Sequence, residues 1–340
     1  MKIGLTYDLR SAYLAEGHGE EETAEFDRDD TIDALENALN ELGYETDRIG
    51  HARDLTRRLV HGDRWDLVFN ICDGLRGTGR EAQVPAILDL YEIPYTFSDP
   101  LTAALSLHKG LTKRVLRDCG VATTDFAEVA TADQADRVDL PFPLFVKPIA
   151  EGTSKGVDSA SRVTNHRELR EICARLIATF HQPALVEPFL AGREFTVGIT
   201  GSGVDATAIG TLEVELLSGA EPHACTYANK ENCEELCRYS IPDADWCNRA
   251  ETLALQAWRA LGCRDAGRVD IRADEAGDLF VMEINPLPGL HPEHSDLPIL
   301  CNQIGVPYVK LIEHVMRSAT QRVLANRKTH RELASHGSAA

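Results

Sequence analysis

Phe145–Gly156 reads FVKPIAEGTSKG, an apolar run that ends at a lysine and continues into a loop of small and charged residues. Such a loop suits phosphate, because backbone N–H groups can approach phosphate oxygens only where side chains are small. Lys147 would supply a positive charge at the end of the strand, and Lys155 a second one in the loop. The alternative is a polar hairpin loop with a solvated lysine. We interpret the segment as a phosphate-binding loop that follows a β-strand.

A second segment, Gly267–Gly289, reads GRVDIRADEAGDLFVMEINPLPG and predicts two strands joined by a turn. Glu283 and Asn285 stand two apart on a strand and share a face, and Asp270 can face the same side. Carboxylate and amide oxygens form a site suited to Mg²⁺. The alternative is a surface strand with ordinary acids, but MEIN lies in an apolar run, where an uncompensated carboxylate is costly. Arg268 is a candidate for stabilising an oxyanion.

The flanking sequence alternates between strand and helix patterns. Lys2–Thr6 and Asp66–Ile71 read as buried strands. Helical spacing follows them at residues 32–42 and 81–91, which favours a parallel sheet covered by helices. Beyond residue 109 we expect helices near 110–120, 164–180, 245–261 and 307–323. Runs rich in β-forming residues lie between them, so the predicted fold class is α/β with α+β subdomains.

The composition and charge exclude some classes of partner for this protein. The chain has 340 residues, with 35 basic and 54 acidic side chains and a formal net charge of −19. That charge repels nucleic acid and anionic membranes, so we expect neither as a partner. No apolar run approaches the roughly 20 residues that span a bilayer, and the amino terminus lacks a signal-peptide pattern. We therefore expect a cytoplasmic protein.

Four segments in this order resemble the ATP-grasp superfamily, and within it the D-alanine–D-alanine ligase family. The first is IPYTFSDPLTAALSLHKGLTKRVL and the second is FVKPIAEGTSKG, which is similar to the family's VKPxxEGSSxG. The third and fourth are LVEPFLAGREFTVGITG and GRVDIRADEAGDLFVMEINPLPG. The resemblance runs from about residue 66 to about residue 315. It implies an ATP-grasp fold with an amino-terminal Rossmann-like subdomain.

The resemblance also implies a reaction and a set of residues. ATP, with Mg²⁺ or Mn²⁺, would convert a small-molecule carboxylate, such as that of an amino acid, into an acyl phosphate, which an amine then attacks. Residues implied in nucleotide binding are Lys109, Lys147, Glu187, Phe189, Leu190, Glu194 and Lys230. The implied metal ligands are Asp270, Glu283 and Asn285, and the implied catalytic residues are Arg268, Ser154 and Gly289. Substrate contacts would come from Glu25, Asp73, Glu231 and Ser295.

The chain departs from the family where the first amino acid binds. The family's amino-terminal GGxSxExxVS motif is absent, and TYDLRSAYLAEGHGEEETAEF stands in its place. Asp73-Gly74 replaces a His-Gly pair, and Lys230-Glu231 replaces Lys-Tyr in the mobile loop, which corresponds to residues 218–243 here. Added carboxylates would make this pocket more negative. We expect a substrate other than D-alanine to be preferred.

The expected organisation has three subdomains and a tail. A Rossmann-like part covers residues 1–110, a central ATP-grasp part covers 111–205, a carboxyl-terminal part covers 206–325, and a polar tail covers 326–340. A homodimer is possible for such a chain. Two alternatives stay open: the same chemistry on other amino acids or on a non-peptide carboxylate, and a non-catalytic nucleotide-binding regulatory protein.

Overall fold

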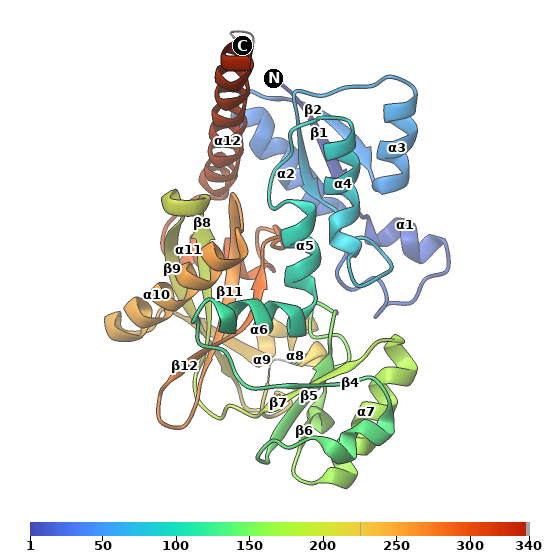
Figure 1. Ribbon diagram of the computed structural model, residues 1–340, viewed down its shortest axis with the longest axis vertical. Helices are drawn as coiled ribbons and strands as arrows, with labels where there is room; N and C mark the ends of the chain where they lie inside the picture. Colours follow the sequence, from blue (N-terminus) through green and yellow to red (C-terminus); the bar gives the residue numbers. More distant parts are fainter. Residues whose placement is uncertain (225, 338–340) are drawn as a thin grey trace.

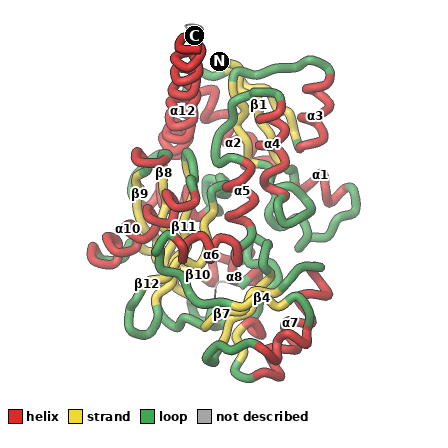
Figure 2. Tube along the Cα trace, viewed as in Figure 1, coloured by secondary structure: helices red, strands yellow, loops and turns green. Residues whose placement is uncertain are grey.

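A computed structural model describes residues 1–224 and 226–337, with the side chains of 1–224, 226–230, 232 and 235–325. Its strands form three sheets, which lie apart from one another in Figure 2. The first sheet has the order β2-β1-β3, the second β4-β7-β5-β6 and the third β10-β9-β8-β11-β12. The ATP-grasp fold that the sequence predicts, with its amino-terminal parallel sheet, is confirmed.

The bounds of the elements are as follows. The strands are β1 (Lys2–Tyr7), β2 (Glu45–Gly50), β3 (Leu67–Ile71), β4 (Ala127–Val129), β5 (Leu144–Pro148), β6 (Arg162–Val163), β7 (Ala184–Pro188), β8 (Glu194–Thr200), β9 (Thr207–Leu216), β10 (Cys237–Ser240), β11 (Ala266–Ala273) and β12 (Leu279–Asn285). The α-helices are α1 (Arg10–Ala15), α2 (Asp29–Glu41), α3 (Ala52–Val60), α4 (Gln83–Leu90), α5 (Pro100–Leu107), α6 (Lys109–Asp118), α7 (His166–Phe180), α8 (Tyr227–Glu231), α9 (Cys233–Leu236), α10 (Ala244–Leu261), α11 (Asp296–Gln303) and α12 (Tyr308–Gly337). Short 3₁₀ helices lie at Arg80–Ala82, Ala132–Arg137, Ser159–Ser161 and Gly203–Asp205.

The amino-terminal sheet is parallel, with β1 paired to both β2 and β3. Alternate residues of β3 point to opposite faces, as a period of two requires. Phe69 lies in the cluster with α2 and α12, whereas Val68 lies in the cluster with α3 and α4. Both faces of the sheet are therefore covered, which explains why β1 and β3 are largely apolar and buried.

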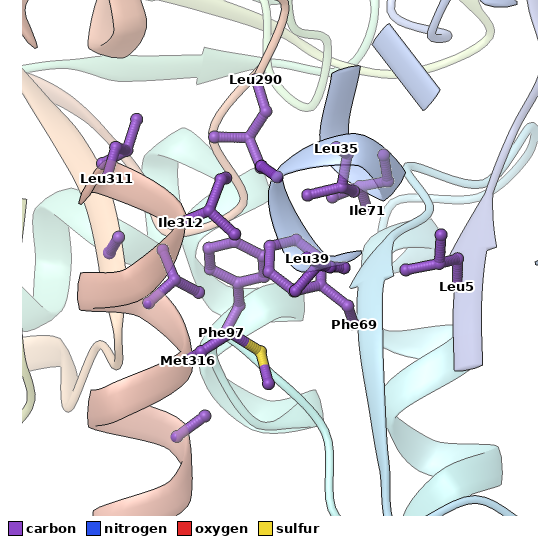
Figure 3. Packing of buried hydrophobic residues seen from close by; sticks show 14 of the residues in the cluster. Leu5, Leu35, Leu39, Phe69, Ile71, Phe97, Leu290, Leu311, Ile312 and Met316 are labelled. Carbon is purple, nitrogen blue, oxygen red and sulfur yellow. The ribbon is translucent and has the colours of Figure 1, made fainter. Parts of the chain in front are cut away.

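Helix α12 is longer than the sequence predicts. It packs against the amino-terminal subdomain, although it lies at the carboxyl-terminal end of the described chain. We expected a helix near 307–323 and a frayed tail from 326, but the helix continues to Gly337 and projects from the body in Figure 1. Its apolar stripe, which includes Ile312 and Met316, packs against Leu39 of α2 (Figure 3). The carboxyl-terminal segment thus completes the core of the amino-terminal subdomain.

Strand β8 differs from its expected place. The range 111–205 puts it in the central subdomain, but β8 pairs with β9 and β11 in the five-stranded sheet. The four-stranded sheet has β7 as its last strand along the chain. An apolar, β-branched run predicts a strand but does not name its partners, because pairing depends on contacts that are distant in sequence.

The segment 218–243 is more regular than its polar composition suggests. Its described residues form α8, α9 and the edge strand β10, which pairs antiparallel with β9. The fully buried Thr226 caps α8, since its side chain accepts a hydrogen bond from Asn229 N at 3.3 Å. The main-chain nitrogen of Tyr227 donates to Val157 O at 3.2 Å, so the segment touches the phosphate loop. In the described part of the chain, no helix is long and apolar enough to cross a membrane.

Candidate active site

A cavity of about 860 Å³ lies between the four-stranded and the five-stranded sheets. Residues from β5 and β7 form one wall, and residues from β8, β11 and β12 form the other. The structure brings together here all the residues predicted to bind the nucleotide, together with one catalytic and two metal candidates. They are Lys109, Lys147, Glu187, Phe189, Leu190, Glu194, Lys230, Ser154, Asp270 and Glu283.

The ammonium group of Lys147 pairs with a buried carboxylate, that of Glu187. Glu187 is completely buried, and its two oxygens lie 2.8 Å from Lys147 Nζ and 2.9 Å from Lys113 Nζ. Burial would raise the pKa of Glu187, but the two ammonium groups outweigh it and lower the pKa to about 2. The Glu187 side chain therefore positions Lys147. The sequence interpretation missed Lys113, although it follows Lys109 by one helical turn on α6.

Lys109 links the phosphate loop to the acidic face of the other sheet. Its Nζ donates to Glu151 O at 2.5 Å and lies 3.3 Å from Glu283 Oε2. In the loop itself, Thr153 and Ser154 have φ values of 49° and 54°. The left-handed conformation is uncommon for residues other than glycine, and such conformations concentrate where a loop binds a ligand.

Strands β11 and β12 present one polar face to the cavity. Asp270 pairs with Glu283, and Arg268 pairs with Asn285, so these four side chains lie on the same side of the sheet. The Asp270 carboxylate accepts hydrogen bonds from Arg268, from Asn285 Nδ2 at 3.0 Å and from Thr196 Oγ1 at 2.9 Å. The predicted metal residues are thus adjacent, and Thr196 is a partner that the sequence did not reveal.

The electrostatics of this face suit a hard cation. Burial, together with the nearby Glu283, raises the pKa of Asp270 to about 6 in spite of Arg268. Burial also acts on Glu283, but Lys109, Lys147 and other nearby cations outweigh it and lower its pKa. The Asn285 amide oxygen has no hydrogen-bond partner among the described residues. Two carboxylates and one available amide oxygen fit Mg²⁺, which binds through few protein ligands together with waters and phosphates.

A second cavity adjoins the first and shares Lys230 with it. Arg268, Gly289, Ser295 and Asp296 line this cavity, together with residues of the amino-terminal segment. A Cβ atom on Gly289 would lie 2.7 Å from Ser295 Oγ, so a larger residue there would displace the Ser295 hydroxyl. The guanidinium of Arg268 lies between two carboxylates, with Nη1 2.9 Å from Asp270 Oδ2 and 2.8 Å from Asp296 Oδ2.

Glu25 lies against the phosphate loop. Both of its oxygens accept hydrogen bonds from Arg80 at 2.8 Å, and Oε1 also accepts one from Gly152 N at 2.5 Å. Lys155 Nζ is 3.5 Å away and also pairs with Glu151. The Glu25 carboxylate, 9% exposed, therefore fastens the amino-terminal segment to the loop.

Other carboxylates gather behind Glu25. Burial and the neighbouring Glu25, Glu81 and Asp27 raise the pKa of Asp73 well above its ordinary value. Burial and the nearby Asp8 raise the pKa of Asp27 to about 8. Asp27 lines the second cavity, whereas Asp73 lines neither cavity. The predicted Glu231 ends α8, and its side chain lies outside the described residues.

The far end of the first cavity is aromatic and basic. The guanidinium of Arg272 lies 5.2 Å from the ring centroid of Phe189, and its Nη1 lies 3.4 Å from Glu194 Oε2. Its Nη2 donates to His223 O at 2.7 Å, which connects β11 to the segment before α8. Arg272 stands two residues after Asp270 on β11 and so shares its face, a signal that the sequence analysis did not use.

Comparison with known proteins agrees with this geometry. A family model described as D-ala D-ala ligase C-terminus matches residues 115–317. The D-alanine–D-alanine ligase of Marinomonas sp. strain MWYL1 is 32% identical over 267 residues, covering 77% of this chain and 80% of the relative. A Bacillus anthracis D-alanine–D-alanine ligase complexed with ATP superposes with a TM-score of 0.69 at 23% identity, covering 94% and 98%. VanG D-Ala:D-Ser ligase from Enterococcus faecalis gives 0.71 at 20% identity, covering 94% and 99%.

The matched family model and the curated relative define an ATP-dependent carboxylate–amine ligase, and the solved structures agree in fold. The matched family model spans more than half of the chain, and the curated relative is matched over more than two thirds of it. The chain belongs to the D-alanine–D-alanine ligase family.

Proposed function

We propose that this ligase uses ATP and Mg²⁺ to activate the carboxylate of an amino acid as an acyl phosphate and joins it to an amine. The observation that carries the proposal is the shared face of Arg268, Asp270, Glu283 and Asn285. That face lies at the junction of two cavities, one lined by the candidate nucleotide-binding residues and one lined by charged groups of both signs. The B. anthracis relative, which is described as complexed with ATP, supports nucleotide in the first cavity.

In this proposal the nucleotide lies between the sheets. Lys109, Lys147 and Lys230 contact the phosphates, and the Lys147 ammonium is positioned by Glu187, which Lys113 holds on its other oxygen. The main chain of residues 187–190 hydrogen-bonds the base, beside Phe189 and Leu190, and Glu194 binds the ribose. The phosphate loop and α8 cover the phosphates, which keeps water from a hydrolysable intermediate.

Asp270, Glu283 and Asn285 would hold Mg²⁺, which would offset charge while the γ-phosphoryl group moves to the carboxylate. Arg268 and the N–H of Gly289 face the position where the tetrahedral oxyanion forms, and preorganised donors at such a position stabilise the transition state. Ser154 donates from the phosphate loop, and Ser295 binds a substrate group in the second cavity.

The substrate is the finer part of the proposal. The curated relative is named for D-alanine, but we propose that D-alanine is not the preferred carboxylate here. Burial and neighbouring acids raise the pKa values of Asp27 and Asp73, so these carboxyl groups behind the amino-terminal wall lack a cation that would stabilise their charged form. A substrate with an extra donor or positive charge would compensate them, whereas a methyl group would not. A homodimer and a cytoplasmic location stay predictions.

The test is a substrate panel. Purified protein with Mg-ATP is incubated with pairs of D- and L-amino acids, including alanine, serine and lysine, while phosphate release and product mass are measured. We expect amide products, with a basic or hydroxylated amino acid ahead of D-alanine in kcat/KM. A lead of about tenfold or more for D-alanine would overturn the substrate proposal. ATP-dependent phosphate release without any amide product from any pair would overturn the ligation itself.

A further inference from the structure

We propose that Asp296 binds the amine substrate as its ammonium form, accepts the proton that this nitrogen must lose before it displaces phosphate from the acyl phosphate, and so selects a positively charged acceptor over a neutral one. This inference rests on the proposed function and adds the residue that receives the second substrate. It concerns a residue to which the sequence analysis gave no role.

The placement of Asp296 is the first support. It begins α11 directly after Ser295, lines the second cavity and has a side chain that is 16% exposed. Its Oδ2 lies 2.8 Å from Arg268 Nη1, whereas Oδ1 has no hydrogen-bond or ion-pair partner among the described residues. One oxygen is therefore fixed by the guanidinium, and the other is available to a ligand in the cavity.

The reaction geometry is the second support. A single nitrogen of Arg268, Nη1, contacts both Asp270 and Asp296. Its Nε and Nη2 have no partner in the described part of the chain. Those donors are available to the oxyanion. The attacking nitrogen must come within about 3.5 Å of the carbonyl carbon whose oxygen Arg268 holds. An acceptor that enters from the second cavity therefore passes the Asp296 carboxylate.

The charge balance of this cavity is the third support. One guanidinium faces two carboxylates, so Asp296 is only partly neutralised. The other arginines of this wall are already engaged with acids, Arg10 with Glu20 at 2.9 Å and Arg28 with Asp30 at 3.0 Å. Lys230 also lines this cavity. Of the other cavity acids, Glu235 has no ion-pair partner among the described side chains, whereas Asp27 keeps its proton near neutral pH because burial and Asp8 raise its pKa to about 8. A cation is the ligand that this wall favours, because it pairs charges that are otherwise partly desolvated.

The experiment compares two small acceptors of similar size. At neutral pH methylamine is a cation, whereas hydroxylamine is mostly neutral and gives a hydroxamate from the same acyl phosphate. The donor is whichever amino acid of the panel above releases the most phosphate, supplied with Mg-ATP. The variants are Asp296→Asn, which removes the charge, and Asp296→Glu, which keeps it. Glu293→Gln is the control, since this exposed carboxylate lies on the same loop but does not line the cavity.

The expected result is selective. Asp296→Asn should lower kcat/KM for methylamine by about 10- to 100-fold, which is the loss expected for a hydrogen bond to a charged group. It should change hydroxamate formation by less than about twofold, and Asp296→Glu should restore much of the methylamine rate. Glu293→Gln should leave both acceptors unchanged. Equal losses with both acceptors would show that Asp296 only holds Arg268 and would overturn the inference, as would no loss at all. If the unmodified protein forms no hydroxamate from any donor, the proposed function has failed, which is a distinct outcome.

Discussion

Replacing Lys113 with methionine removes one of the two cations that hold the buried Glu187 carboxylate. Lys113 is 1% exposed and Glu187 is 0% exposed. The Lys113 ammonium also donates to Thr123 and Thr124, each at 2.9 Å. Breaking a buried ion pair costs about 3–5 kcal/mol when the remaining charge is left alone. Here Lys147 still contacts Glu187 at 2.8 Å, so we expect a loss of about 2–4 kcal/mol.

Thermal unfolding of the ligand-free protein measures this loss. A change of that size should lower Tm by roughly 3–6 °C in a chain of this length. The matched control is Lys310→Met, because that lysine is 56% exposed and contacts only Glu313 on the same helix. The control should change Tm by about 1 °C or less, since exposed pairs contribute little. If Lys113→Met and Lys310→Met have the same Tm, the buried ion pair between Lys113 and Glu187 does not stabilise the fold.

Three further outcomes follow from the same contacts. Lys147→Ala should weaken ATP binding by about tenfold or more in calorimetry without a change in circular dichroism, and unchanged affinity would contradict its role in phosphate binding. Burial and Asp8 raise the pKa of Asp27 to about 8, so the folded protein retains a proton there that the unfolded chain releases above about pH 4. Stability from this group is therefore present at low pH and lost as pH rises toward 8. Asp27→Asn should raise Tm at pH 8 more than at pH 5, and an equal change at both would contradict the assignment. Limited proteolysis should cut residues 218–243 in the free protein and be suppressed by ATP, Mg²⁺ and substrate together; equal cutting in both states would remove the covering role.

The sequence predicted the elements of the candidate site that are contiguous in the chain. The phosphate loop at 145–156 and the paired strands at 267–285 each carry their own periodicity and turn signals, and both are where they were expected. The fold class followed from the same local patterns, because strand and helix periods differ. Nucleotide candidates from four separate segments line one cavity, as their order in the chain implied.

The rest depends on contacts between distant residues, which no local pattern shows. Lys113 meets Glu187 and Arg268 meets Asp296 only after the sheets pack. Glu25 has the residue type of an amine ligand, yet Arg80 reaches it from the 3₁₀ helix before α4 and fixes it to the phosphate loop. The apolar stripe of α12 predicted a helix but not the subdomain whose core it completes. Periodicity shows which side of a helix or strand is buried, but it does not show which other element packs against that side.

Steady-state turnover of Glu283→Gln tests the central claim, that a metal-bound phosphoryl transfer occurs on the face of β11 and β12. With saturating Mg-ATP and the best substrate pair of the panel, kcat should fall by at least about 100-fold, because a lost metal ligand removes charge stabilisation in the transition state. Glu275→Gln is the control, since this exposed residue lies in the turn between the same two strands and should keep normal turnover. A near-normal kcat for Glu283→Gln, measured as phosphate release and amide product together, would contradict the account.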